Sequence, residues 1–428
     1  MIPLFRPSIT DAEIDAVADV MRSGWLGLGP KTAEFEAAFA EHVGAAHAVG
    51  MSSGTAALHL ALEGLGVGEG DEVLVPTITF ASTAHVVHHL GATPVFVDVT
   101  EDTICMDPND AAARITSRTK AILPVHYGGH PADMDALGAL AEQHGLFLLE
   151  DAAHACGAEW RGERVGTLSR ATCFSFHAVK NLACGEGGMV TTDDDELAAR
   201  LKRQRWLGID KDTISRTDTG ETYAWQYWIR EFGHKAHLSD IAAAIGLVQL
   251  SRLDEMNAAR RRLVERYRES LSDLDFLTLP AERDGALSAW HIFHARLVQR
   301  DDLIGFLKKR DIAPGVHYYP LHMHPVYRDA AERLPVAERV WQQLISLPLY
   351  PDMTQAEQDE VIGALREFGD AVAWRPPVVE AAGVRLREVV STDLESIRAW
   401  RNDESHRRWF FDSSEISEAQ QSAWWNGY

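Results

Sequence analysis

LFLLEDAAHACG, residues 146–157, is a short apolar run that ends in Glu150 and Asp151, with His154 three residues further on. An apolar run of this length predicts a buried strand. Open α/β sheets bind ligands at the carboxyl ends of their strands, so an acid at this point is well placed to meet a ligand. An ordinary helix cap is the alternative explanation for Asp151.

The same kind of run recurs along the chain and sets the fold class. Strands are predicted at 71–76, 93–98, 120–126, 171–176 and 188–193. Helix-like runs at 55–65 and 134–145 lie between several of them. Strands that alternate with helices predict an α/β fold with a mostly parallel sheet covered on both faces.

The rest of the chain predicts further elements and domains. Residues 10–43 look helical, with Ser8, Thr10 or Asp11 as the cap, and a long helix is expected from Leu238 to about Ser270. Mixed patterns at 275–370 indicate a smaller α+β domain, and a Pro pair near 376 indicates a linker. The expected domains are 1–250, 251–370, a linker at 371–383, and a separate unit at 384–428.

Composition narrows the classes of function. The chain has 428 residues and a formal net charge of −22, which disfavours nonspecific binding to nucleic acid or to anionic membranes. Its four cysteines form no CxxC pair, so neither a disulfide framework nor a metal site is expected. No apolar run approaches the roughly 20 residues of a membrane span, and the start lacks a signal pattern. The expected location is the cytosol, with no membrane or nucleic-acid partner.

Three further stretches supply candidate chemistry. SSGTAAL (52–58) opens a helix and suits a phosphate, although it could be only a tight turn. PTITFAST (76–83) follows a strand, and its Phe80 could stack on a planar ligand or simply belong to the core. FSFHAVKNLACGEGGMV (174–190) places Lys180 between a strand and a glycine cluster.

Together these are the parts that pyridoxal phosphate requires. A lysine holds the aldehyde as a Schiff base, and a carboxylate keeps the pyridine nitrogen protonated. A helix N-terminus with hydroxyls holds the phosphate, and an aromatic side chain covers the ring. Neither a G-x-G-x-x-G dinucleotide fingerprint nor a G-x-x-x-x-G-K-[ST] loop is present.

Motifs in this order resemble those of the DegT/StrS-type nucleotide-sugar aminotransferases, which are fold-type I pyridoxal-phosphate enzymes. The likeness covers roughly residues 1–370 and rests on SGWLGLGPKTAEFE (23–36), GDEVLVPTITFAST (70–83), EDAAHACGA (150–158), FSFHAVKNLACGEGGMVTTDD (174–194), GHKAHLSDIAAAIGLVQL (233–250) and SLPLYPDMT (346–354). The nearest likeness is to the UDP-4-amino-4-deoxy-L-arabinose–oxoglutarate aminotransferase group. The resemblance implies a large domain with a seven-stranded sheet and a smaller C-terminal domain.

The resemblance also assigns roles at the cofactor. Lys180 would bind the aldehyde and shuttle the proton, with its pKa lowered by local electrostatics, and Asp151 would pair with the pyridinium nitrogen. His154 would lie beside the ring, where many members have Gln, and Phe80 would stack on it. The phosphate would be held by Gly54, Thr55 and Ser175.

Other roles concern the substrate and a second subunit. Lys235 would reach the phosphate of the neighbouring subunit, which implies a homodimer with shared active sites. His177 and His322 would contact the substrate. Trp25 and Tyr319 would line the nucleotide or sugar pocket, or be structural aromatics. Segment 233–237, GHKAH, departs from the common family pattern, which leaves sugar specificity open.

The implied reaction moves an amino group from glutamate to a UDP-linked 4-keto sugar, for a cell-surface glycan. The alternatives are a 3-keto or dTDP-linked substrate, a pyridoxal-phosphate sugar dehydratase, a synthase of an aromatic amino acid precursor, and a catalytically inactive cofactor-binding regulator or scaffold. Lys180 argues against the dehydratase, because members of that kind carry histidine there.

Residues 384–428 resemble the opening strand and helices of GNAT-type N-acetyltransferases, as in VRLREVVSTDLESIRAWRND. The acetyl-CoA motif of that family, Q/R-x-x-G-x-G/A, does not follow. We therefore expect no acetyltransferase activity from the chain as given.

Overall fold

The computed structural model describes residues 1–211, 226–327, 333–373, 379–381, 384–386, 394–403 and 415–421. The chain divides into two compact units, Met1–Gly369 and Asp370–Tyr428.

The elements that form the sheet region and its covering helices are α1 (Asp11–Ser23), α2 (Pro30–Val43), β1 (His47–Met51), α3 (Gly54–Gly64), β2 (Glu72–Pro76), α4 (Ser82–His89), β3 (Thr93–Val97), α5 (Pro108–Ala113), β4 (Thr119–Ile122), η1 (Tyr127–Gly129), α6 (Met134–His144), β5 (Phe147–Asp151), β6 (Glu159–Trp160), β7 (Glu163–Arg164), β8 (Ala171–Ser175), β9 (Gly188–Thr192) and α7 (Asp195–Gln204). All the strands and both interstrand helices predicted from the sequence are present. Strands β1, β6 and β7 were not predicted.

A sheet of seven strands, in the order β1-β9-β8-β5-β4-β2-β3, forms the centre of the first unit. The pairs from β8 to β3 are parallel, and β9 is antiparallel to both of its neighbours. Six strands therefore run in one direction, which confirms the predicted mostly parallel α/β sheet. Their carboxyl ends meet along one edge.

Side chains that alternate along the strands supply two separate cores, as the two-residue period of a strand requires. Phe174 and Met189 belong to a cluster with Phe35 of α2 and Ala243 of the long helix that follows. Their neighbours Cys173 and Val190 belong to a cluster with residues of α3 and α6. The sheet is thus covered on both faces, as expected.

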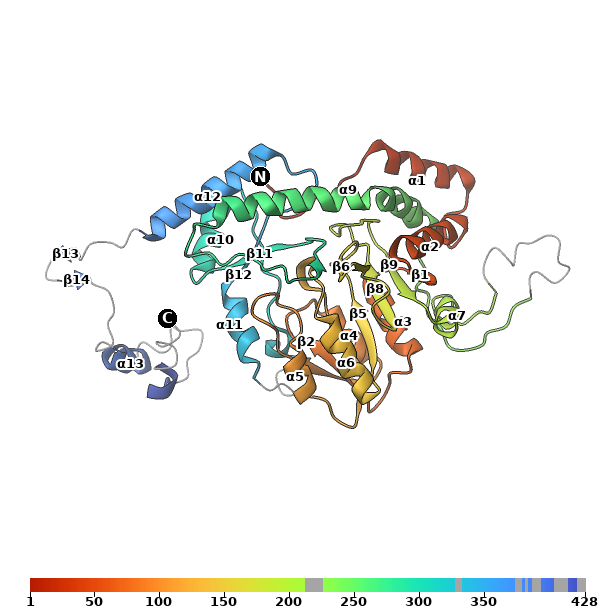
Figure 1. Cartoon of the computed structure of the whole chain (residues 1–428), viewed down its shortest axis with the longest axis horizontal. Helices are drawn as coiled ribbons and strands as arrows, with labels where there is room; N and C mark the ends of the chain where they lie inside the picture. Colours follow the sequence, from red (N-terminus) through yellow and green to blue (C-terminus); the bar gives the residue numbers. More distant parts are fainter. Residues whose placement is uncertain are drawn as a thin grey trace. The chain divides into compact units, whose positions relative to one another are not determined.

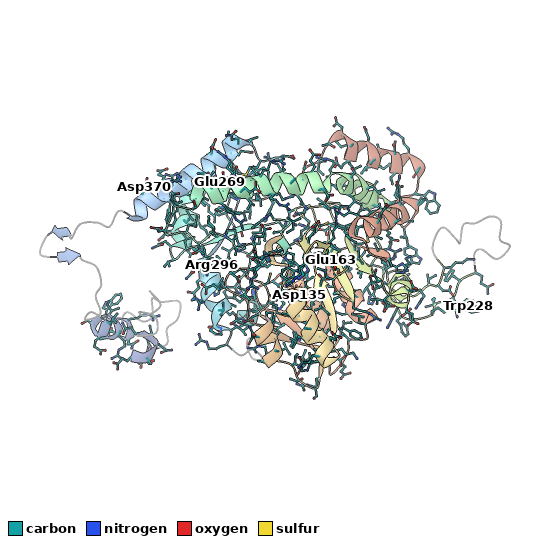
Figure 2. All side chains as sticks on the ribbon, viewed as in Figure 1. Asp135, Glu163, Trp228, Glu269, Arg296 and Asp370 are labelled. Carbon is teal, nitrogen blue, oxygen red and sulfur yellow. The ribbon has the colours of Figure 1, made fainter. Side chains whose placement is uncertain are left out.

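The later elements of the first unit are α9 (Asp240–Leu271), β10 (Ala286–Leu287), β11 (Phe293–Arg296), α10 (Arg300–Lys308), η2 (Leu321–Met323), α11 (Pro335–Gln343), β12 (Leu344–Leu347) and α12 (Gln355–Ala373). Helix α9 runs from α1 and α2 at one end to the neighbourhood of α10 and α12 at the other (Figure 1). Side chains fill the space between α9, which carries Glu269, and β11, which ends at Arg296 (Figure 2). Strands β11 and β12 pair antiparallel. The expected domain boundary after residue 250 falls inside α9, so this one helix extends through both expected domains.

Local sequence explains where the first helix begins. Thr10, one of the three predicted caps, forms a capping box with Glu13 in which the two side chains satisfy each other's backbone groups. No helix within the described part of the chain is both long and apolar enough to cross a membrane.

The second unit contains β13 (Val379–Ala381), β14 (Val384–Leu386) and α13 (Leu394–Asn402). Strands β13 and β14 pair antiparallel. The likeness of residues 384–428 to an acetyltransferase start, and the linker at 371–383, stay predictions.

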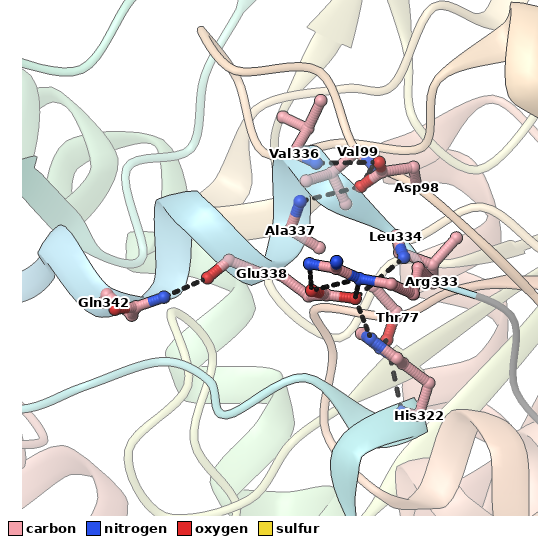
Figure 3. Close-up of polar contacts among 10 residues, drawn as sticks. All are labelled: Thr77, Asp98, Val99, His322, Arg333, Leu334, Val336, Ala337, Glu338 and Gln342. Carbon is pink, nitrogen blue, oxygen red and sulfur yellow. Dashed lines mark hydrogen bonds and ion pairs between the residues drawn. The ribbon is translucent and has the colours of Figure 1, made fainter. Parts of the chain in front are cut away.

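Asp98, at the end of β3, holds helix α11 against the sheet domain (Figure 3). Its buried carboxylate accepts hydrogen bonds from the backbone N–H groups of Val336 and Ala337, at 2.9 and 2.8 Å. The first N–H groups of a helix have no partner within the helix, and α11 has no side-chain cap of its own. A residue distant in sequence therefore caps α11.

We expect Asp98→Ala to lower the free energy of unfolding by about 1–3 kcal/mol, because one buried and one partly buried N–H group lose their acceptor. Urea denaturation followed by circular dichroism measures this change. Asp284→Ala, at an exposed side chain in the loop before β10, is the matched control and should have little effect. Equal stability of Asp98→Ala and wild type would contradict the role of Asp98 as a cap.

Candidate active site

A cavity of about 430 Å³ opens at the edge where the carboxyl ends of the parallel strands meet. Residues from the ends of β1, β2, β4, β5 and β8 line it, together with the loop after β8 and a segment before η2. The lining residues are Ser53, Gly54, Thr55, Leu58, Thr79, Phe80, Ser82, Val125, Asp151, Ala153, His154, Ser175, His177, Val179, Lys180, Glu186, His317 and Tyr318. Eight of the twelve predicted site residues are among them.

Asp151 ends β5 and is buried at the cavity wall. Thr83 donates a hydrogen bond to its Oδ2 at 2.8 Å, and the N–H of Ala153 donates to Oδ1 at 3.1 Å. Burial raises the pKa of Asp151, while these hydrogen bonds and the positive charge of Lys180 oppose that rise. No helix begins after Asp151, so it is not a helix cap. Its surroundings favour a cationic partner.

Glu150 points to the opposite face of the sheet from Asp151 and has a structural role. Its carboxylate is fully buried and accepts hydrogen bonds from Ser169 and Thr172, each at 2.7 Å. The ring of His126 lies 2.7 Å from it; because Nδ1 of His126 accepts the N–H of Ala132, Nε2 donates to Glu150. Glu150 therefore does not line the cavity.

Lys180 follows β8 on the loop that enters the cavity. Burial lowers the pKa of Lys180 to about 8, and the negative charge of Asp151 opposes this shift. The predicted direction of the pKa change is confirmed, but its cause is loss of hydration, and the nearby charge acts the other way. A substantial share of the amine is neutral near pH 8.

His154 lines the cavity between two aromatic neighbours. Its ring packs 4.6 Å from His291, and its Nε2 lies 3.2 Å from the hydroxyl of Tyr318. Burial holds the pKa of His154 well below its usual value, so the ring is neutral. Within the part of the chain that the structure describes, its buried Nδ1 has no hydrogen-bond partner. Such an atom requires a partner from a bound ligand or from water.

The N-terminus of α3 forms the other end of the cavity. The Ser53 side chain caps the helix by accepting the N–H of Ala56 at 3.1 Å. A Cβ at Gly54 would lie 2.8 Å from that of Ser175, so only glycine allows β8 to approach this closely. Similarly, a Cβ at Gly188 would lie 2.4 Å from the carbonyl oxygen of Ser53. Unpaired helix N–H groups and the hydroxyls of Thr55 and Ser175 therefore gather in a place suited to a phosphate.

These features fit pyridoxal phosphate. The orphaned Nδ1 of His154, the narrow approach at Gly54, the buried carboxylate of Asp151 and the amine of Lys180 share one cavity. Phe80 is 60% exposed at the cavity wall, so it is not a core residue.

Four predicted residues lie outside this cavity in the single chain. His322 is buried, and its Nδ1 lies 2.7 Å from the Thr77 hydroxyl, in the network of Figure 3. Tyr319 packs edge-on against Trp341 at 4.8 Å. Neither lines the cavity as expected for a substrate contact.

The other two are Trp25 and Lys235. A Cβ at Gly29 would lie 3.0 Å from the ring of Trp25, so Trp25 packs on the turn before α2. The amine of Lys235 lies over the ring of Trp206, 3.2 Å from its centroid. Its expected role concerns a neighbouring subunit, so it stays a prediction.

Sequence reasoning missed several cavity residues. Tyr318 and His317 line it, one and two positions before the predicted Tyr319. Thr83, which does not line the cavity but donates a hydrogen bond to Asp151, was part of the quoted stretch PTITFAST. Glu186 lay within the glycine cluster after Lys180, and its Oε1 is 3.8 Å from Nε2 of His177.

Known proteins resemble this chain over most of its length. The model of the DegT/DnrJ/EryC1/StrS aminotransferase family matches residues 7–366. The spore coat polysaccharide biosynthesis protein SpsC of Bacillus subtilis is 42% identical over 378 residues, which cover 86% of this chain and 97% of SpsC.

Solved structures of aminotransferases are also similar to this chain. The aminotransferase TlmJ from Streptoalloteichus hindustanus is 37% identical with a TM-score of 0.81, and the match covers 87% of this chain and all (100%) of TlmJ. The putative sugar aminotransferase Spr1654 from Streptococcus pneumoniae, in its PMP form, is 33% identical with a TM-score of 0.82, covering 87% of this chain and 100% of its own.

We expect Lys180 in the cofactor-free protein to react with acetic anhydride with a midpoint near pH 8, because only the neutral amine reacts and burial lowers its pKa to about 8. Trace labelling across pH, followed by digestion and mass spectrometry, measures the midpoint, with exposed Lys202 as reference. Asp151→Asn should move the midpoint lower, because the charge of Asp151 raises this pKa. A midpoint near 10, the value of a free lysine, would refute the burial effect.

Thr83→Val should lower kcat of the amino transfer about tenfold. It removes the hydrogen bond to Asp151, and a hydrogen bond to a charged group contributes about 1.5–3 kcal/mol. Losing that bond also raises the pKa of Asp151, so the acidic limb of the pH–rate profile should move to higher pH. Thr83→Ser keeps the hydroxyl and should restore both. An unchanged profile in Thr83→Val would show that Thr83 does not position Asp151.

Proposed function

The chain belongs to the DegT/DnrJ/EryC1/StrS aminotransferase family, and from this membership we propose that it transfers an amino group from glutamate to a UDP-linked 4-keto sugar with pyridoxal phosphate as cofactor. The family and its solved relatives are sugar aminotransferases, so the chain is an enzyme of the transferase class. The observation that carries the proposal is the meeting of Lys180, Asp151 and the α3 N-terminus in one cavity.

The residues that would hold the cofactor follow from the chemistry of each group. Lys180 would hold the aldehyde, and Asp151 would accept a hydrogen bond from the protonated ring nitrogen. The N-terminus of α3 and Ser175 would hold the phosphate, and Phe80 would cover one face of the ring. The orphaned Nδ1 of His154 would gain a hydrogen-bond partner. That Spr1654 has been solved in PMP and PLP forms supports this assignment.

When bound, the cofactor supplies an electron sink for the bond that breaks next to the amino group. Lys180 would act as base and acid, with its Nζ moving a proton between the cofactor carbon and the sugar carbon. An amine with a pKa of about 8 suits this task near neutral pH, because both protonation states are accessible. Asp151 keeps its negative charge through its bonds to Thr83 and Ala153.

The open end of the cavity supports a sugar as the acceptor. The side chains of His177 and Glu186 are 47% and 70% exposed there, and the hydroxyl of Tyr318, 3.2 Å from Nε2 of His154, also belongs to the cavity lining. Carboxylate, imidazole and phenol groups suit the hydroxyls of a sugar. The name of SpsC, which concerns polysaccharide biosynthesis, supports a cell-surface glycan as the destination. Within the family we propose the UDP-4-amino-4-deoxy-L-arabinose–oxoglutarate aminotransferase group, on the motifs described above.

We further propose a cytosolic homodimer with shared active sites. Trp228 and Phe232, which precede Lys235, are 58% and 99% exposed in the single chain. Large apolar side chains with this exposure favour burial against a second copy. A partner seated there would cover the segment that carries Lys235.

A screen of UDP- and dTDP-linked keto sugars with ¹⁵N-glutamate tests the function. We expect ¹⁵N to appear in a UDP-linked 4-amino sugar by mass spectrometry. Lys180→Ala should abolish turnover with the fold retained, and Asp151→Asn should lower the rate severely by losing the charge at the ring nitrogen. Amination by Lys180→Ala at the wild-type rate would refute the mechanism. Cofactor binding without transfer from any donor would favour the scaffold.

A further inference from the structure

A cluster of three metal-ligating side chains lies outside the cavity. His59 and Glu63 are one turn apart on α3, so both side chains project from the same face of the helix. The third member, His234, comes from the loop before α9. One potential ligand atom of each side chain lies within 4.8 Å of the others.

Contacts already draw the three side chains together. The Nε2 of His234 lies 2.9 Å from the Glu63 carboxylate. The rings of His59 and His234 meet edge to face, with centroids 5.3 Å apart. His234 therefore contacts both His59 and Glu63, so the three side chains form one cluster.

The loop that carries His234 is fixed to the domain by its backbone. The N–H of His234 donates to the carbonyl oxygen of Gln204 at 2.6 Å, and its own carbonyl oxygen accepts the N–H of Leu207 at 2.9 Å. Two residues later, Ala236 bonds to Arg205 and to Ser52. Helix α3 packs on α7, which ends at Gln204. Both sides of the cluster are thus held in place before any ion arrives.

The donor set suits a divalent transition metal. Two imidazole nitrogens and one carboxylate oxygen are ligands that zinc accepts, with a fourth position left for water. At bond lengths of about 2.1 Å, tetrahedral ligand atoms lie roughly 3.4 Å apart, which modest side-chain rotations from the observed spacing can reach. The negative charge of Glu63, in a chain of net charge −22, favours a cation.

We propose that His59, Glu63 and His234 form a binding site for a divalent transition-metal ion, with zinc as its typical occupant. The ion would clamp segment 233–237, which carries Lys235, to α3. Because Leu58 and the first turn of α3 line the cavity, the clamp would join that segment to the cavity wall. This site was not predicted from the sequence, because the three residues form no local metal motif.

Zinc titration of the untagged, chelator-treated holoprotein by calorimetry tests the site. We expect one ion per chain, and at least tenfold weaker binding in both His59→Ala and Glu63→Gln. Glu63→Gln is the gentler change, because its amide oxygen can still accept a hydrogen bond from His234. Zinc should also raise the melting temperature of the wild type and leave that of both variants unchanged. His144→Ala, at an exposed histidine on α6, is the matched control and should bind like wild type.

A rival site must be separated from this one. His85 and His89 are also one turn apart, on α4, with ring centroids 6.2 Å apart. Binding that is lost in His85→Ala but kept in His59→Ala and Glu63→Gln would overturn the proposal, as would a wild-type protein that binds no zinc.

Discussion

The active site depends on one constraint: the carboxyl ends of β1, β2, β4, β5 and β8 must reach the same edge of the sheet. Parallel pairing sets this for four of them. β1 joins them only because β9 runs the other way between β1 and β8. At that crowded edge Gly188 passes the carbonyl of Ser53, and Gly54 passes Ser175, at distances that no larger residue permits.

Burial then gives the gathered side chains their chemistry. Loss of hydration lowers the pKa of Lys180 and raises that of Asp151, and each charge partly offsets the shift of the other. Thr83 and the N–H of Ala153 keep Asp151 in place, while Glu150, on the opposite face, is occupied by His126, Ser169 and Thr172. Two adjacent acids therefore have separate tasks, which follow from the alternation of a strand.

The sequence predicts most of the fold and the cofactor end of the site, because local patterns encode both. Apolar runs predict six of the seven central strands. The exception is β1, HAVGM, which has a glycine in its interior and pairs with β9, a strand distant in sequence. Residues beside a strand end, such as Asp151 and Ser175, were found. His322 and Tyr319 do not line the cavity of the single chain, because they are held by Thr77 and Trp341, which are distant in sequence. Thr83 and Tyr318 were missed because the side chains that they contact, Asp151 and His154, are distant from them in sequence.

We propose that Lys180 holds pyridoxal phosphate and that glutamate is the donor. The most direct test is the absorbance spectrum of the purified protein before and after glutamate is added. We expect a visible band from the lysine-bound cofactor, which glutamate converts to the near-ultraviolet band of pyridoxamine phosphate. No visible band, even after pyridoxal phosphate is supplied, would contradict it.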